Sequence, residues 1–153
     1  MAKKTFNQKL NDVSQEFEIV DLSNKPEFVS RYNAVKMLIA PPTAYNEIMA
    51  KVPAGRILTS DKIREYLAKN HGAEITCPLT AGIFINICAN AAAERNDKNF
   101  PYWRTTKSKG ELNEKYPGGI DAQKVLLEME DIAIIQKGRR CFVKDFESIL
   151  YKL

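Results

Sequence analysis

The chain lacks several features that would place it in other classes of protein. It has no apolar run near the roughly 18 residues that a membrane span needs, so we expect no membrane association. Met1-Ala2-Lys3-Lys4 is followed by polar residues, so no secretory signal peptide is expected. Cys77, Cys88 and Cys141 are odd in number and form no CxxC pair, which favours a reducing, cytoplasmic compartment over a disulfide framework. These cysteines and the single His71 show no metal-ligand spacing, so we expect no metal and no cofactor.

The composition is that of an ordinary globular protein with a modest excess of positive charge. The 153 residues are 44% hydrophobic and 27% charged, which suits one domain. The formal net charge is +4, and the segment 95–124 holds seven Lys and Arg against four acids. Such a zone attracts phosphate groups, although a charge of this size also suits a solvated surface.

Two helices in the middle of the chain are the clearest structural signal. Thr59 or Ser60 can cap the first helix, and Gly72 can end it. Pro78 suits the first position of the second helix, which we expect over about 79–93. Two stripes run along this second helix, one apolar and one small and polar: Leu79, Ile83 and Ile87, and Gly82, Asn86 and Asn90. Two helices joined by a tight, glycine-containing connection predict a helix-turn-helix.

The other segments are short, and together they predict an α+β fold. In chain order the pattern indicates a helix over 43–52, a strand over 102–106, a turn over 107–110, a helix over 121–129, a hairpin of strands 132–135 and 141–143, and a helix over 145–153. Residues 1–24 are polar with weak periodicity, which predicts an extended arm or a frayed helix. We therefore divide the chain into an N-terminal extension over 1–40 and one domain over 41–153.

Several short motifs follow one another along the domain. They are Val52-Pro53-Ala54-Gly55-Arg56, Thr59-Ser60, Ile87-Cys88-Ala89-Asn90, Pro101-Tyr102-Trp103-Arg104, Ser108-x-Gly110, Tyr116-Pro117-Gly118-Gly119 and Leu127-Glu128-Met129-Glu130. From about Val52 to Asp131, their order and spacing resemble the DNA-binding domain of methylguanine-DNA methyltransferases and their non-catalytic, alkyltransferase-like relatives. The resemblance implies a winged helix-turn-helix DNA-binding domain, with the C-terminal hairpin and helix following it. It also implies that the Glu of the last motif holds the residue at the position of Trp103.

The aromatic motif Phe100-Pro101-Tyr102-Trp103-Arg104 stands where the related enzymes carry Pro-Cys-His-Arg. In those enzymes the Cys takes an alkyl group from a damaged guanine, and the His activates its sulfur. A phenol with a pKa of about 10 cannot replace a thiolate at neutral pH. An indole N–H only donates, so it cannot act as the base. The resemblance thus implies a site that keeps its aromatic surface and has no catalytic residue.

The chain also departs from the family pattern at two other places. Asp61 occupies the place where the enzymes carry a Tyr. Near Thr80-Ala81-Gly82, where they insert an Arg into the base stack, this chain has no Arg. Base flipping by this protein would therefore need another wedge. The non-catalytic relatives typically replace only the Cys, so the replacement of both Cys and His sets this chain further apart.

The function implied by the resemblance is non-enzymatic binding of double-stranded DNA, with recognition of O6-alkylguanine and transfer of the lesion to a repair-protein partner. Aromatic rings can stack on a base, amides can read base edges, and lysines can bind phosphates. The candidate DNA-contacting and base-pocket residues are Thr80, Asn86, Asn90, Tyr102, Trp103, Arg104, Lys107, Lys109 and Tyr116.

Three of these residues also have an ordinary structural interpretation. Trp103, the only Trp, suits the core beneath the helix-turn-helix. Asn90 can bridge to a neighbouring loop through its side chain, and the Arg at the position of Arg104 is largely structural in the family.

Two other functions remain open at the level of the sequence. An active methylated-DNA–protein cysteine methyltransferase would have to use a non-equivalent thiol, Cys77 or Cys88. A winged-helix regulator or protein-interaction module would act without lesion specificity. A cavity beside the second helix, lined by Tyr102 and Trp103, would favour lesion recognition. Rings that are covered by other side chains would favour the plain winged-helix binder.

Overall fold

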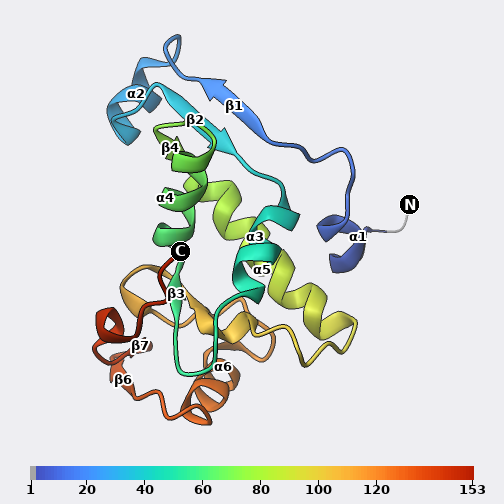
Figure 1. The fold of residues 1–153 in the computed structure, drawn as a ribbon, viewed down its shortest axis with the longest axis vertical. Helices are drawn as coiled ribbons and strands as arrows, with labels where there is room; N and C mark the ends of the chain where they lie inside the picture. Colours follow the sequence, from blue (N-terminus) through green and yellow to red (C-terminus); the bar gives the residue numbers. More distant parts are fainter. Residues whose placement is uncertain (1–2) are drawn as a thin grey trace.

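Two helices joined by a short connection lie at the centre of the structure (Figure 1), a computed structural model that describes residues 3–153. α4 (Ser60–Asn70) carries Asp61 in its first turn, where a carboxylate interacts favourably with the helix dipole. Gly72 follows α4 with a φ of 70°, a left-handed conformation that glycine adopts without a steric penalty. α5 (Pro78–Glu94) begins with Pro at its first position. Both helices lie where the sequence predicts them.

α5 is the helix around which the main hydrophobic core forms. Its buried face includes Ala81, Ile85, Cys88 and Ala92, which recur at helical spacing. α1 (Phe6–Leu10) and α3 (Pro42–Ala50) both pack against α5. α3 contributes the fully buried Tyr45 and Met49 to this core, and α4 contributes Ile63 and Leu67. The predicted helix over 43–52 is therefore confirmed.

The N-terminal residues form more structure than an arm or a frayed helix, so that expectation is wrong. β1 (Glu18–Asp21) pairs antiparallel with β2 (Lys36–Ile39), and β2 pairs in parallel with β4 (Ile75–Thr76) just before α5. α2 (Pro26–Tyr32) connects β1 to β2. Because β2 pairs with a strand inside the predicted domain, the segment 1–40 is joined to that domain by backbone hydrogen bonds. The division at residue 40 stays a prediction.

A second, smaller core forms from residues 102–150 together with the segment around Ile57. Its elements are β3 (Leu58–Thr59), η1 (Tyr102–Arg104), β5 (Thr105–Thr106), η2 (Ser108–Gly110), α6 (Gly119–Glu128), β6 (Ile134–Lys137), β7 (Arg140–Val143) and η3 (Phe146–Ile149). β3 pairs in parallel with β5, and β6 pairs antiparallel with β7. Ile57, Leu112 and Leu127, each 0% exposed, are at the centre of this core. The predicted hairpin and the helix over 121–129 are confirmed.

Two expected elements differ from the structure, each for a local reason. The strand predicted over 102–106 is a 3-10 turn followed by only two strand residues. The helix predicted over 145–153 is a four-residue 3-10 turn. The backbone N–H of Ile57 donates to the carbonyl of Ile149, and the N–H of Tyr151 donates to the carbonyl of Ile57. The C-terminal segment thus pairs with Ile57, which is remote in the sequence, and does not continue as a helix.

Two classes of feature are absent from the part of the chain that the structure covers, residues 3–153. No helix there is long and apolar enough to cross a membrane. No cluster of three or more His, Cys, Asp or Glu side chains there is arranged to hold a metal ion.

Candidate nucleic-acid interface

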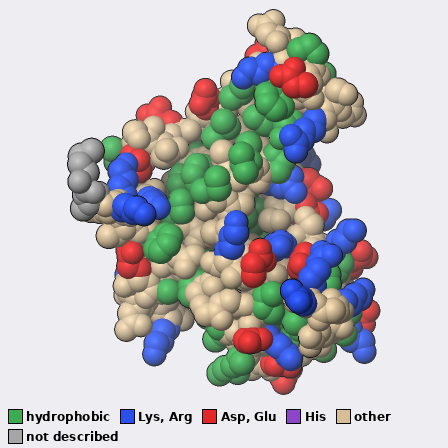
Figure 2. Space-filling model, turned by 180° about the vertical axis from the view of Figure 1, so that it is seen from behind, with side chains coloured by type: hydrophobic (Ala, Val, Ile, Leu, Met, Phe, Trp, Pro, Cys, Tyr) green, Lys and Arg blue, Asp and Glu red, His purple; other side chains and the backbone are tan. Residues whose placement is uncertain are grey.

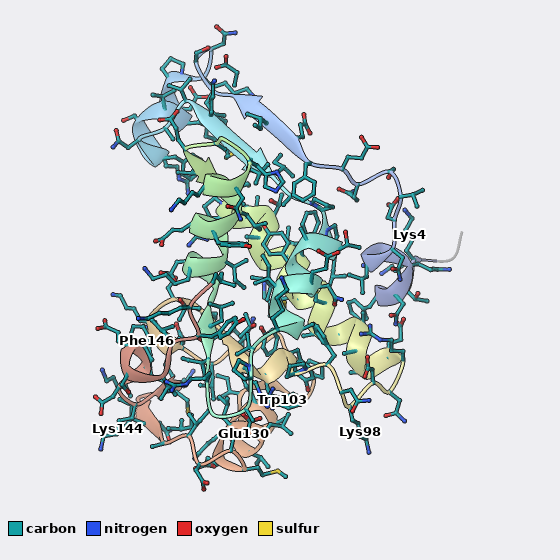
Figure 3. The ribbon with its side chains drawn as sticks, viewed as in Figure 1. Lys4, Lys98, Trp103, Glu130, Lys144 and Phe146 are labelled. Carbon is teal, nitrogen blue, oxygen red and sulfur yellow. The ribbon has the colours of Figure 1, made fainter. Side chains whose placement is uncertain are left out.

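The side chain of Glu130, just after α6, connects three separate segments of the chain. Its carboxylate accepts hydrogen bonds from Trp103 Nε1 at 2.7 Å, from Arg104 Nε at 3.0 Å and from the backbone N–H of Gly55 at 2.9 Å. Figure 3 shows Trp103 and Glu130 close together in the smaller half of the molecule. A charge-assisted hydrogen bond to a largely buried carboxylate is stronger than a neutral one. The network therefore holds the aromatic motif in a defined position.

This geometry assigns structural roles to Arg104 and Trp103. Arg104 also donates from Nη1 to the carbonyl of Val52 at 2.8 Å, and its side chain is only 17% exposed. Its guanidinium is thus engaged inside the protein, which favours the structural interpretation of Arg104. Trp103 is half-buried and packs against the smaller core. Its indole N–H is likewise used by Glu130.

Tyr102 is the half-buried ring at the surface of the same turn. It meets Trp103 and Tyr116 edge-on, with ring centroids 5.4 Å away in both cases. Burial raises the pKa of Tyr102 above its ordinary value, so its phenol is neutral at physiological pH. Two edge-on aromatic neighbours support the ring and leave part of it open to solvent.

Tyr116 is not available to DNA in this structure, which corrects its placement among the contact residues. Its side chain is 3% exposed, and its hydroxyl donates to the carbonyl of Thr105 at 2.8 Å. Burial raises the pKa of Tyr116. Tyr116 instead supports Tyr102 from beneath. Gly118 and Gly119 follow it at φ values of 75° and 72°, a tight turn that glycine allows.

α5 exposes one stripe of its surface beside a shallow groove, here called the α5 groove, with a volume of about 300 Å³. Its lining comes from α4, α5, β5 and the segment after β5: Ser60, Pro78, Leu79, Gly82, Ile83, Ile85, Asn86, Thr106, Lys107, Asn113, Glu114 and Lys115. Asn86 and Lys107 are the predicted site residues that line it. The groove thus brings together a helix surface, amides and cations.

The two asparagines of α5 have different contacts. Asn86 Oδ1 accepts from Asn113 Nδ2 at 2.8 Å, which fixes its amide at the wall of the α5 groove. Asn90 Nδ2 donates to the carbonyls of Asn86 and Lys115 at 2.8 and 3.1 Å. Asn90 therefore bridges the helix to the loop through its side chain. Thr80 lies on α5 outside the groove lining, and its hydroxyl is within 3.5 Å of the Cys77 carbonyl.

The lysines predicted as phosphate contacts lie in two different places. Lys107 lines the α5 groove and forms an ion pair with Glu114 at 3.2 Å. Lys109 instead lines a separate cavity beside the β6–β7 hairpin. Lys115, which was not among the predicted contacts, lines the groove with an exposed side chain. The sequence could have indicated Lys115 as a contact residue, because Lys115 stands directly before Tyr116, which was predicted to be one.

Gln123, also absent from the prediction, positions the groove wall from the inside. This side chain is 1% exposed. Its Oε1 accepts from the backbone N–H of Asn113 at 2.7 Å, and its Nε2 donates to the carbonyl of Trp103 at 3.0 Å. One buried amide thus holds the aromatic turn and the asparagine loop in fixed register.

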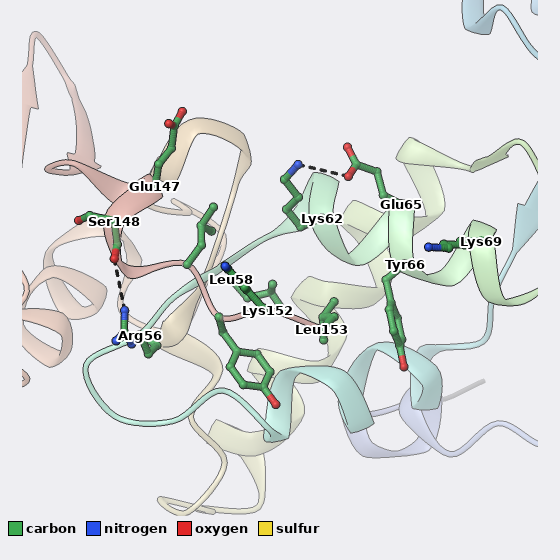
Figure 4. A pocket seen from close by; sticks show the side chains of 12 residues that line it. Arg56, Leu58, Lys62, Glu65, Tyr66, Lys69, Glu147, Ser148, Lys152 and Leu153 are labelled. Carbon is green, nitrogen blue, oxygen red and sulfur yellow. Dashed lines mark hydrogen bonds and ion pairs between the residues drawn. The ribbon is translucent and has the colours of Figure 1, made fainter.

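A larger hollow lies elsewhere, between α4 and the C-terminal segment (Figure 4), with a volume of about 930 Å³. Arg56 lines it and donates to the carbonyl of Ser148 at 3.3 Å, while Lys62 pairs with Glu65 at 3.3 Å. None of the nine predicted site residues lines this hollow. It is therefore separate from the candidate interface.

The three thiols are all buried, which bears on the alternative of a non-equivalent cysteine nucleophile. Burial raises the pKa of Cys88 to about 12, so that thiol is protonated at neutral pH. Cys88 Sγ also lies 3.4 Å from the carbonyl of Pro42, inside the core. Cys77 is 8% exposed at the N-cap of α5.

We expect no alkyl transfer to any of the three cysteines when the protein is incubated with a duplex that carries O6-methylguanine. The physical reason is the burial of each thiol and the lack of a Cys at position 102. Mass spectrometry of the digested protein measures the result, with Cys77→Ser as the control for the thiol at the start of α5. Stoichiometric methylation of any cysteine would restore the methyltransferase alternative.

The comparisons with solved structures identify the class of fold. The arrangement is similar to that of S. pombe Atl1 in complex with damaged DNA containing O6-carboxymethylguanine, with a TM-score of 0.51 and 19% identity over 73% of this chain and 94% of that one. S. pombe ATL in complex with DNA is similar with a TM-score of 0.50 and 17% identity over the same shares. No protein-family model and no curated protein matches the chain. The expected α+β class is thereby confirmed, and the fold is similar to that of S. pombe Atl1.

Proposed function

We propose that this protein binds double-stranded DNA through the α5 groove without performing chemistry on it. The observation that carries the proposal is the exposed stripe of α5, which lies beside Lys107 and Lys115 in a fold shared with two DNA complexes. Cations beside the exposed stripe of a helix suit a polyanionic duplex. Asn113 holds Asn86 Oδ1 at the groove wall, so the amide Nδ2 of Asn86 is oriented to donate to a base edge.

We further propose that the protein prefers duplexes containing O6-alkylguanine, and that Tyr102 is the ring that contacts the altered base. The partly open ring is held between Trp103 and Tyr116, so its orientation is already set before binding. The S. pombe Atl1 complex, which shares this fold, contains a DNA lesion of this chemical class, O6-carboxymethylguanine. Base–aromatic stacking contributes about 1–3 kcal/mol per base.

A second candidate, plain duplex binding without lesion preference, is favoured by one observation. Tyr102 is packed edge-on by two other rings, and the α5 groove is lined by residues other than Tyr102 and Trp103. A base would have to leave the α5 groove to reach Tyr102. The two candidates differ in whether affinity changes when a guanine in the duplex is alkylated.

Replacing Lys115 by Ala is expected to weaken binding to all duplex sequences alike and to reduce the slope of log affinity against log salt by about one. Lys115 is exposed at the α5 groove and would release one condensed counterion on contact with a phosphate. Fluorescence anisotropy titrations at several salt concentrations measure both quantities.

Lys109→Ala is the matched control, because it removes the same charge from the separate cavity beside the β6–β7 hairpin. We expect it to leave the slope unchanged. If Lys109→Ala flattens the slope and Lys115→Ala does not, the α5 groove is not the surface that binds DNA.

A further inference from the structure

α5 exposes large apolar side chains on the face that borders the α5 groove. Leu79 is 70% exposed and Ile83 is 48% exposed, although the opposite face of the same helix is buried in the main core. The sequence places both residues in one apolar stripe with Ile87, but only Ile87 is buried. Leu79 and Ile83 are four residues apart, so their side chains are neighbours on the surface of the helix.

Gly82 lies between these two side chains and leaves the backbone of α5 open. A Cβ built at Gly82 would meet no atom within 4 Å, so the protein itself does not require a glycine there. Its φ is outside the left-handed region, so an ordinary residue would fit the backbone as well. In a helix, glycine is less favourable than alanine by about 1 kcal/mol. What the glycine provides is close approach from outside to the α5 backbone.

The surroundings of this apolar pair are polar and cationic. The groove beside it carries the Asn86–Asn113 amide pair, the Lys107–Glu114 ion pair and the exposed ammonium group of Lys115. Figure 2 shows the face opposite to that of Figure 1, where hydrophobic side chains gather over the middle and upper part of the molecule and charged side chains of both signs lie around them. A small apolar centre with amides and cations beside it matches a base stack flanked by phosphates.

We propose that Leu79 and Ile83 form an apolar wedge that enters the base stack of bound duplex DNA, with Gly82 allowing the helix backbone to come close. This inference rests on the proposed function, since it assumes that DNA occupies the α5 groove. Leu and Ile are among the side chains that proteins insert between base steps to unstack and kink a duplex.

The wedge also gives the protein a means of selecting a weakened base pair. Unstacking costs least where a base is damaged or mispaired. An alkylated guanine pairs less well than an unmodified one, so insertion beside it meets less resistance. Discrimination would then arise in two steps, opening by Leu79 and Ile83 and contact with the altered base by Tyr102.

The test uses a duplex with 2-aminopurine next to the O6-methylguanine, because the fluorescence of this base rises when it is unstacked. Wild-type protein is expected to raise the fluorescence several-fold on binding, while the double variant Leu79→Ala, Ile83→Ala abolishes the rise. Val125→Ala on α6 is the matched control, since Val125 is also apolar and 56% exposed. Gly82→Gln places a larger side chain where a Cβ meets no atom of the free protein within 4 Å, and it is expected to weaken duplex binding at least tenfold with thermal stability no lower than that of the wild type.

The outcomes separate the wedge from the underlying DNA binding. If anisotropy shows that wild-type protein binds the duplex but the fluorescence does not rise, the wedge is wrong and the proposed function stands. A rise that survives in the double variant also overturns the wedge. Absence of duplex binding overturns both. Sedimentation of the free protein tests whether a second copy of the chain occupies this face instead of DNA. A dimer that dissociates in the double variant would assign Leu79 and Ile83 to a contact between two copies and would overturn the wedge.

Discussion

Trp103→Ala is expected to lower the free energy of unfolding by about 3–5 kcal/mol, the range typical for truncation of a large core aromatic. Two effects contribute to this loss. The ring packs against the smaller core, so its removal leaves a cavity. Its indole N–H is also a donor to the carboxylate of Glu130 at 2.7 Å, and that carboxylate is only 13% exposed. When a largely buried carboxylate loses a hydrogen-bond donor, part of the free energy spent in removing it from water is no longer offset.

Chemical denaturation monitored by circular dichroism measures this change, since the single Trp is lost as a fluorescence probe. Met129→Ala is the matched control: Met129 precedes Glu130, is 76% exposed and should change stability by no more than about 0.5 kcal/mol. Glu130→Gln keeps the shape of the network and removes its charge, so it should destabilise the protein through Arg104. A Trp103→Ala protein as stable as Met129→Ala would show that the network does not hold the aromatic motif.

Tyr102→Ala is expected to reduce the preference for O6-alkylguanine over guanine by about five- to 150-fold, the equivalent of one lost base stack. The effect on folding should be smaller than that of Trp103→Ala, because Tyr102 is partly open to solvent and contributes two edge-on ring contacts of about 0.5–1.5 kcal/mol each. Parallel titrations of alkylated and unmodified duplexes give the preference, and thermal melts give the stability.

Tyr102→Phe is the informative companion variant. It keeps the ring, the edge-on packing and the stacking surface, and it removes only the hydroxyl. We expect it to retain the lesion preference of the wild type. If Tyr102→Ala keeps the full preference, the ring does not contact the altered base, and the plain duplex binder becomes the better account.

The sequence predicted the helical elements well because their signals are local. Pro78 at the start of α5, the turn at Gly72 and the 3.6-residue periodicity of α4 are all properties of neighbouring residues. The β1–β2–β4 sheet was missed because its pairing joins Met37 to Ile75, and no local sequence pattern predicts a contact between residues so far apart in the chain. The helix predicted over 145–153 is wrong for the same reason, because backbone hydrogen bonds join that segment to Ile57, which is remote in the sequence.

For the candidate site, the sequence indicated the types of residue present better than the contacts that each residue makes. The resemblance drew attention to the aromatic motif, and its Glu does hold the side chain at position 103. Burial was harder to predict from the sequence. Tyr116 and Arg104 look like contact residues in the sequence, but in the structure Tyr116 is buried and the guanidinium of Arg104 donates to the carbonyl of Val52. Lys115 and Asn113 reach the groove because the buried Gln123 holds their loop, and that role depends on tertiary packing.

The measurement that tests the central claim most directly is the affinity of the wild-type protein for two duplexes that differ only in one O6-methyl group on guanine. Titrations at several salt concentrations separate the phosphate contribution, which both duplexes share, from recognition of the altered base. The account predicts parallel salt slopes and an affinity about five- to 150-fold higher for the alkylated duplex. Equal affinities at every salt concentration would contradict it and leave a duplex-binding protein without lesion recognition.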